Sequence, residues 1–150
     1  MGSFSVMRTI DAPAQDVWAV LAEIGEIHAW NPGVESSRLT TEQKEGVGAG
    51  RHCDLSGRNY VDEEVVEWQP GERLTMRVIG TNLPFKIAEI HFLLRAQDGS
   101  TAVTVSLEYD LKFGVAGKLL DLLLVRRIYE RGMGALLSGL KREVERRARS

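Results

Sequence analysis

The stretch that decides the fold of this 150-residue chain is FKIAEIHFLLRAQDGSTAVTVSLEYDLK, residues 85–112. Apolar and polar side chains alternate over 101–112, which is the period of a strand with one face toward solvent. The tetrapeptide QDGS at 97–100 separates this run from the apolar run 85–96 and is typical of a hairpin turn. We therefore predict two long, antiparallel, neighbouring strands.

The segment that follows, 118–149, predicts one long helix. It contains no proline and is rich in helix-forming residues. Its apolar residues recur three or four positions apart, and most of its arginines fall between them. A helix with such an apolar stripe must cover an apolar surface, and the sheet is the surface available.

Upstream of the hairpin, short runs with the period of a strand alternate with glycine and proline turns. We expect strands at 3–10, 34–43, 51–55, 60–68 and 73–79. The tripeptide DAP at 11–13 predicts the start of a helix that ends at Gly25, and a second short helix is expected at 27–30. Because the turns are short, the sheet must be antiparallel, which makes the fold class α+β.

Composition excludes several classes of protein. One cysteine excludes a disulfide framework and a zinc site built from several thiolates. A formal net charge of −2 gives no general attraction for nucleic acid. No apolar run has the length of a membrane span, and the first residues do not resemble a secretion signal. We expect one cytoplasmic domain over 1–150, without a metal or cofactor.

Four short motifs occur in an order that points to a known superfamily. They are IDAPAQDVW at 10–18, WNPGV at 30–34, VGAGR at 47–51 and EVVE at 64–67. With the long last helix, they resemble the START-like, birch-pollen-allergen-like superfamily, and within it the bacterial polyketide cyclase/dehydrase-like (SRPBCC) proteins. The resemblance implies a helix-grip fold, in which a curved seven-stranded sheet wraps around the long helix and leaves a hydrophobic cavity. Members of the superfamily bind sterols, lipids, hormones or polyketides there, and only some are enzymes.

The parity of each strand predicts which side chains face this cavity. On strand 51–55, Arg51 shares a face with the apolar Cys53 and Leu55, so His52 and Asp54 would face water.

Strand 60–68 is ambiguous by pattern, because each of its faces carries both valines and acidic residues. Glu63 lies on one face and Glu64 on the other. The resemblance favours Glu64 as the inward residue, since the family often places a glutamate there that faces the pocket. We hypothesise that Arg51 and Glu64 form an ion pair inside the cavity, because a buried charge needs a partner.

The same reasoning, applied to all elements, predicts a set of ligand-binding residues. They are Trp30, Arg51, Cys53, Leu55, Glu64, Val66, Trp68, Met76, Val78, Ile90, Phe92, Val105, Leu107, Tyr109, Val125, Tyr129 and Met133. Core packing would explain each aromatic or sulfur residue in the set equally well. The loops 56–60 and 80–85 are either ordinary turns or a lid over the cavity mouth.

Two other residues are weaker candidates for chemistry. His28 is either a histidine at the cavity rim or a general base, and Cys53 is either a small buried apolar residue or a nucleophile. No two histidines have the spacing of a metal site.

The function that these observations favour is binding, transport or sensing of a small hydrophobic molecule such as a lipid, an aromatic polyketide or an isoprenoid. The alternative is a cofactor-independent cyclase/dehydratase. In it, Glu64 would take a proton beside a carbonyl while Arg51 and Tyr109 stabilise the enolate. A second alternative is a ligand-free module that binds other proteins. We expect no nucleic-acid partner and at most transient membrane contact, and the chain would be a monomer or a homodimer.

Overall fold

The computed structural model describes residues 2–112 and 119–150, with the side chains of the last helix described from residue 123 onward. Its sheet has seven strands in the order β1-β7-β6-β5-β4-β3-β2, and every neighbouring pair is antiparallel. The predicted fold class and sheet are therefore confirmed. The strands are β1 (Gly2–Ile10), β2 (Val34–Leu39), β3 (Gly50–Leu55), β4 (Tyr60–Gln69), β5 (Arg73–Thr81), β6 (Phe85–Gln97) and β7 (Ser100–Leu111).

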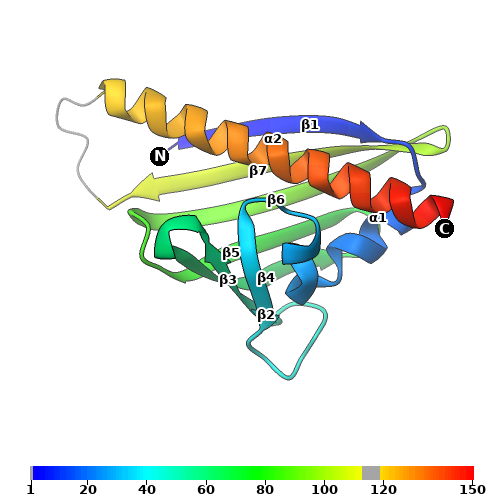
Figure 1. Ribbon diagram of the computed structural model, residues 1–150, viewed down its shortest axis with the longest axis horizontal. Helices are drawn as coiled ribbons and strands as arrows, with labels where there is room; N and C mark the ends of the chain where they lie inside the picture. The colour runs from blue at the N-terminus through cyan, green and yellow to red at the C-terminus, as the bar shows by residue number, and fades with distance from the viewer. Residues whose placement is uncertain (1, 113–118) are drawn as a thin grey trace.

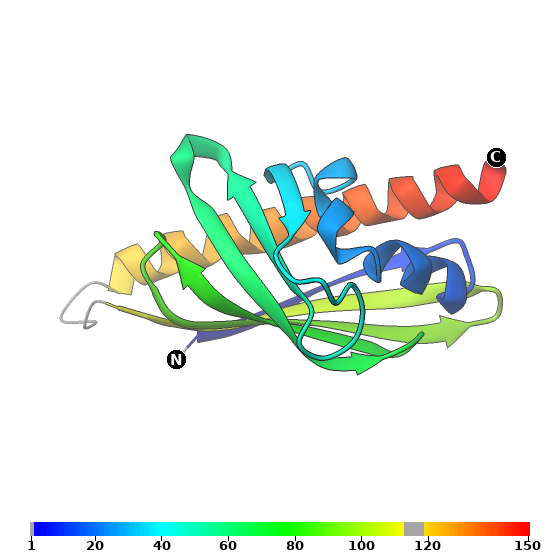
Figure 2. The same ribbon diagram turned by 90° about the horizontal axis from the view of Figure 1, so that it is seen from below.

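Helices occupy the two ends of the chain in the predicted order. After β1 come α1 (Ala14–Leu21) and the short 3-10 helix η1 (Ile24–Ala29), and the chain closes with α2 (Leu119–Arg149). A further 3-10 turn, η2 (Ser56–Arg58), joins β3 to β4. Figure 2 shows the sheet bending around α2, which crosses its concave side. Among the described residues, no helix is long and apolar enough to cross a membrane.

The observed elements differ from the predicted ones mainly at their ends. Strand β2 stops at Leu39, four residues short of the predicted end, because 40–49 forms a loop in which Gly46 and Gly48 have positive φ. Helix α1 ends at Leu21, and Ile24 belongs to η1, so the second short helix begins earlier than expected. Residue 118, the predicted first residue of the long helix, lies outside the described residues.

The core lies mainly toward the end of the molecule where α1, η1 and the C-terminal half of α2 meet the sheet (Figure 1). Leu137 and Leu140 of α2 are fully buried there with Val17 and Val20 of α1. Lys141 and Arg147 of α2 also reach across, to the Thr9 carbonyl at 3.1 Å and to Glu23 at 2.8 Å. This close packing at one end leaves the other end of the sheet and helix less filled.

Candidate functional site

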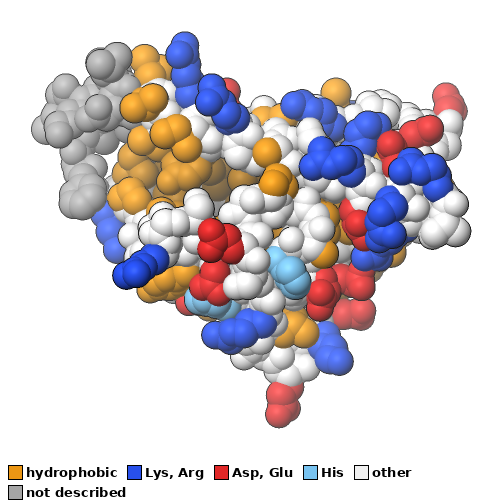
Figure 3. Space-filling model, viewed as in Figure 1, with side chains coloured by type: hydrophobic (Ala, Val, Ile, Leu, Met, Phe, Trp, Pro, Cys, Tyr) orange, Lys and Arg blue, Asp and Glu red, His pale blue; other side chains and the backbone are white. Residues whose placement is uncertain are grey.

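The described residues enclose a cavity of about 450 Å³ between the inner face of the sheet and α2. Figure 3 shows a hollow on this face of the molecule, surrounded by hydrophobic side chains, between α2 and the turn that joins β3 to β4. Most of the lining is apolar. It consists of Ile27, Asn31, Gly33, Val34, Arg51, Cys53, Leu55, Ser56, Asn59, Val61, Glu63, Val78, Leu83, Phe85, Ala88, Ile90, Phe92, Leu107, Ile128, Tyr129, Gly132, Met133 and Leu136.

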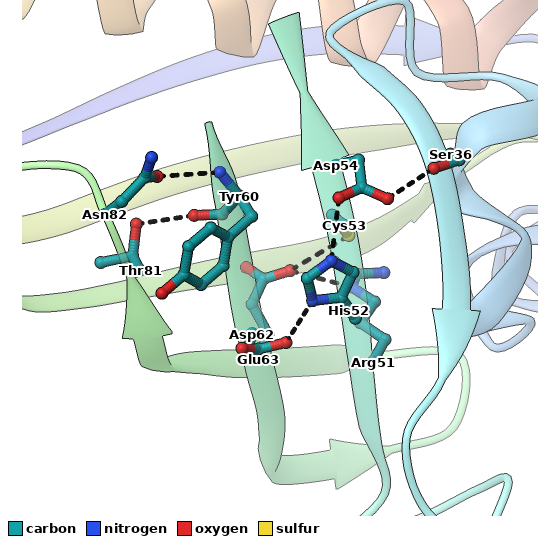
Figure 4. Close-up of polar contacts among 10 residues, drawn as sticks. All are labelled: Ser36, Arg51, His52, Cys53, Asp54, Tyr60, Asp62, Glu63, Thr81 and Asn82. Atoms are coloured by element: carbon teal, nitrogen blue, oxygen red, sulfur yellow. Dashed lines mark hydrogen bonds and ion pairs between the residues drawn. The ribbon is translucent and has the colours of Figure 1, made fainter. Parts of the chain in front are cut away.

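The charged part of this lining is an ion pair between neighbouring strands. Arg51 on β3 and Glu63 on β4 are directly opposite each other in the register, so their side chains share a face. Arg51 Nε donates to Glu63 Oε1 at 2.9 Å, and Arg51 Nη1 donates to the Ile24 carbonyl at 3.1 Å. The two side chains are only 4% and 3% exposed, which places a salt bridge in the wall of a mostly apolar space (Figure 4).

The hypothesis that Arg51 pairs with Glu64 is wrong. Glu64 lies opposite Gly50 on β3 and Arg77 on β5, so it is on the face of the sheet that points away from the cavity. The physical reason is the register of the β3–β4 hairpin, which aligns Arg51 with Glu63. The inward face of this part of β4 is the one that carries Val61, Glu63 and Val65.

A bulge in β4 explains why Trp68, which was predicted to face inward together with Glu64 and Val66, does point inward although Glu64 does not. The β4–β5 register shifts between Val65 and Glu67, so Val66 occupies the irregular position and is not part of the lining. After the shift, Trp68 packs against the core, with its ring 5.0 Å from that of Trp18. Trp68 therefore points inward, but toward the filled end and not into the cavity.

The predicted ligand-binding residues divide into two groups. Nine line the cavity: Arg51, Cys53, Leu55, Val78, Ile90, Phe92, Leu107, Tyr129 and Met133. Eight lie outside its lining: Trp30, Glu64, Val66, Trp68, Met76, Val105, Tyr109 and Val125.

Half of the second group is buried elsewhere. Trp30, Met76 and Val105 belong to the main core. Tyr109 lies in a separate cluster, edge-on to the rings of Phe4 and Phe85 at 6.4 and 6.0 Å. Parity separates inward from outward side chains but does not say where along the strand the interior is filled.

The predicted set omitted fourteen of the cavity residues, which lie on strands, in or after the two 3-10 helices, in the turn between β5 and β6, and on α2. Glu63, Ala88 and Phe85 are on strands, Asn31 follows η1, and Ile128 is on α2. For Glu63 a signal existed, because Val61 and Val65 of the same parity are apolar. The residues 56–60 and 80–85, considered as a lid, contribute Ser56, Asn59, Leu83 and Phe85 to the wall.

Two ionisable groups in the wall stay protonated. Burial is the main cause that raises the pKa of the Cys53 thiol to about 12, and the nearby Arg51 charge only partly opposes it. Burial also raises the pKa of Tyr129. A thiol of this kind is a poor nucleophile, so its surroundings favour the role of a small apolar wall residue for Cys53.

The outer face of the same strands carries a separate cluster around His52. Its Nδ1 lies 2.6 Å from Asp62 and its Nε2 lies 2.9 Å from Asp54, while the ring stacks on Tyr60 (Figure 4). These hydrogen bonds, first with Asp54 and then with Asp62, raise the pKa of His52 above 6.5. His28 is exposed, outside the cavity lining, and is bonded through Nδ1 to the Ser37 hydroxyl at 2.6 Å.

The raised pKa of His52 predicts how stability depends on pH. A group whose pKa is higher in the folded state stabilises that state fully below its unfolded pKa, and the contribution declines as pH rises through the folded value. The free-energy advantage of the wild type over His52→Gln should therefore be largest below pH 6.5 and shrink above it. Urea unfolding of both proteins at several pH values below and above 6.5 measures this difference. His28→Gln is the control, because it also removes one imidazole. An advantage that grows with pH would contradict the assignment.

Comparison with known proteins gives the family. The model of the family described as polyketide cyclase/dehydrase and lipid transport matches residues 1–145. No curated protein is similar enough to this chain to count as a match.

Solved structures show the same fold. The Zhui aromatase/cyclase from Streptomyces sp. R1128 has a TM-score of 0.85 at 21% identity, over 99% of this chain and 96% of that one. A START superfamily protein from Mycobacterium smegmatis has a TM-score of 0.79 at 16% identity, over 96% and 97%. The major latex-like protein 151 from Panax ginseng has a TM-score of 0.75 at 15% identity, over 95% and 96%. The resemblance inferred from the sequence motifs is confirmed, and the chain belongs to the polyketide cyclase/dehydrase and lipid transport family.

Proposed function

We propose that this protein binds a small, predominantly apolar molecule in the cavity between the sheet and α2. The observation that carries the proposal is the cavity of about 450 Å³, whose wall combines many apolar side chains with one buried ion pair. Sites for small molecules have this composition, because apolar area supplies affinity and a few polar groups set orientation. The ligand is a lipid, an aromatic polyketide or an isoprenoid, and its binding serves transport or sensing.

A pair of substitutions on one strand tests the proposal. Ala88 on β6 is 1% exposed and lines the cavity, whereas Ala96 on the same strand is exposed. Ala88→Phe should fill part of the space and weaken binding of the neutral dye N-phenyl-1-naphthylamine by at least about tenfold, which corresponds to ~1.4 kcal/mol. Ala96→Phe should leave the affinity unchanged.

Dye fluorescence, which rises when the dye enters an apolar site, measures both affinities, and circular dichroism checks the fold. Equal affinities for the two variants would show that the dye binds elsewhere.

A catalytic role is the second candidate, favoured by the carboxylate and guanidinium that face an apolar space. The sequence-based version of this role used Glu64 and Tyr109, neither of which lines the cavity. The residues that support it are Glu63 as the proton acceptor and Arg51 as the group that stabilises a developing oxyanion. Turnover of an aromatic poly-β-ketone by the wild type, lost in a Glu63→Gln variant that still binds it, would favour the enzyme over the carrier.

A further inference from the structure

The ion pair at the cavity wall uses only part of its hydrogen-bonding capacity. Arg51 donates through Nε and Nη1, and Glu63 accepts at Oε1, which the Cys53 thiol also approaches at 4.0 Å. The second bond of a bidentate pair, from Arg51 Nη2 to Glu63 Oε2, is not formed between these two described residues. Arg51 Nη2 and Glu63 Oε2 are therefore a donor atom and an acceptor atom of the pair that do not bond to each other.

Both free atoms keep contact with open space. In the described part of the chain, the fully buried side-chain polar atoms without a hydrogen bond are Trp30 Nε1 and His91 Nε2, and the latter is in ion-pair contact with Glu108 Oε1 at 2.9 Å. Arg51 Nη2 and Glu63 Oε2 are not among them, although their residues are almost entirely buried. Because both residues line the cavity, the open space that they contact is the cavity.

The described lining of the cavity carries no net formal charge. Arg51 and Glu63 are the charged residues of its described lining, and their charges cancel. A ligand carboxylate placed against Arg51 would also lie against Glu63, which repels it. A ligand ammonium placed against Glu63 would likewise be repelled by Arg51. An ion moved from water into such a space without its own counter-charge loses several kcal/mol of solvation.

We propose that the ligand of this cavity is an uncharged apolar alcohol or phenol whose hydroxyl inserts between Arg51 and Glu63. The hydroxyl donates its hydrogen to Glu63 Oε2 and accepts from Arg51 Nη2, so one group fills both free positions. The inference rests on the proposed binding function and narrows it to a ligand class. It also gives the site a means of discrimination, because an ether can only accept and a carboxylate is repelled by Glu63.

Three ligands with the same ring system separate these possibilities. They are 2-naphthol, 2-methoxynaphthalene and 2-naphthoate, each titrated at pH 7 by displacement of N-phenyl-1-naphthylamine from the wild-type protein. We expect 2-naphthol to bind at least about tenfold more tightly than either of the others, which is the effect of one charge-assisted hydrogen bond. A naphthoate or methyl ether that binds as tightly as 2-naphthol overturns the inference but leaves the proposed function intact. Failure of dye and all three ligands to bind overturns both.

Substitution of the pair shows whether it is the source of the discrimination. Replacing both residues, Arg51→Met with Glu63→Met, removes the charges together and avoids an uncompensated buried ion. In this double variant 2-naphthol and 2-methoxynaphthalene should bind with equal affinity. A preference for 2-naphthol that survives the double substitution would assign the discrimination to another group and overturn the inference.

Discussion

Gly139→Ala is expected to unfold the protein at a markedly lower urea concentration than the wild type. A Cβ atom at this position of α2 would overlap the Trp30 carbonyl oxygen, and it would lie 3.1 Å from the Trp30 carbonyl carbon and 3.3 Å from Pro32 Cδ. The obstacle is mainly backbone, so no side-chain rotation relieves the contact, and α2 must move away from the turn after η1. We expect a loss of about 3 kcal/mol, because the strain exceeds the gain of about 1 kcal/mol in helix propensity.

Gly132 in the same helix is the matched control. A Cβ there meets nothing within 4 Å among the described residues. Gly132→Ala should therefore show only the propensity effect and stabilise the protein by up to about 1 kcal/mol. Equal unfolding midpoints for Gly139→Ala and the wild type would mean that α2 and Trp30 are not in contact as described.

The two neighbouring glutamates of β4 should respond very differently to the same substitution. Glu63→Gln leaves the Arg51 charge buried without its counter-charge, and we expect a loss of about 3 kcal/mol in the free energy of unfolding. Glu64, on the outer face and only half-buried, should tolerate Gln with a change of less than about 0.5 kcal/mol. Urea unfolding at neutral pH compares the two variants directly.

The double variant Arg51→Met with Glu63→Met completes this comparison. Because it removes both charges, it should recover much of the stability that Glu63→Gln loses. A large loss for Glu64→Gln with none for Glu63→Gln would place Glu64 inside, as the family resemblance had implied, and would contradict the observed register.

Local patterns were enough to predict the architecture. The turn between β6 and β7 was visible because Asp98 and Gly99 are residues that adopt positive φ, and both do so here. The long apolar stripe of α2 needed a surface to cover, and the alternation in β7 supplied one. These signals are local in sequence, so they can be recognised without knowledge of the three-dimensional packing.

The cavity was harder to predict because its wall depends on the register of the strands and on which part of the interior is filled by other side chains. The choice between Glu63 and Glu64 turned on which residue of β4 faces Arg51, and a shift of one residue exchanges the two faces of a strand. The bulge after Val65 then changed the parity again, which no simple alternation predicts. Whether an inward residue lines a cavity or packs in the core depends on the helices above it, as Tyr109 and Leu107 on one strand illustrate.

A crystal structure of the protein soaked with N-phenyl-1-naphthylamine would show whether an apolar ligand enters the cavity. We expect the dye inside the cavity, in contact with Phe92, Leu107 and Met133, with its amine nearest to Arg51 and Glu63. Dye found only on the exposed apolar residues of α2, such as Leu123 and Leu124, with the interior space still empty, would contradict it.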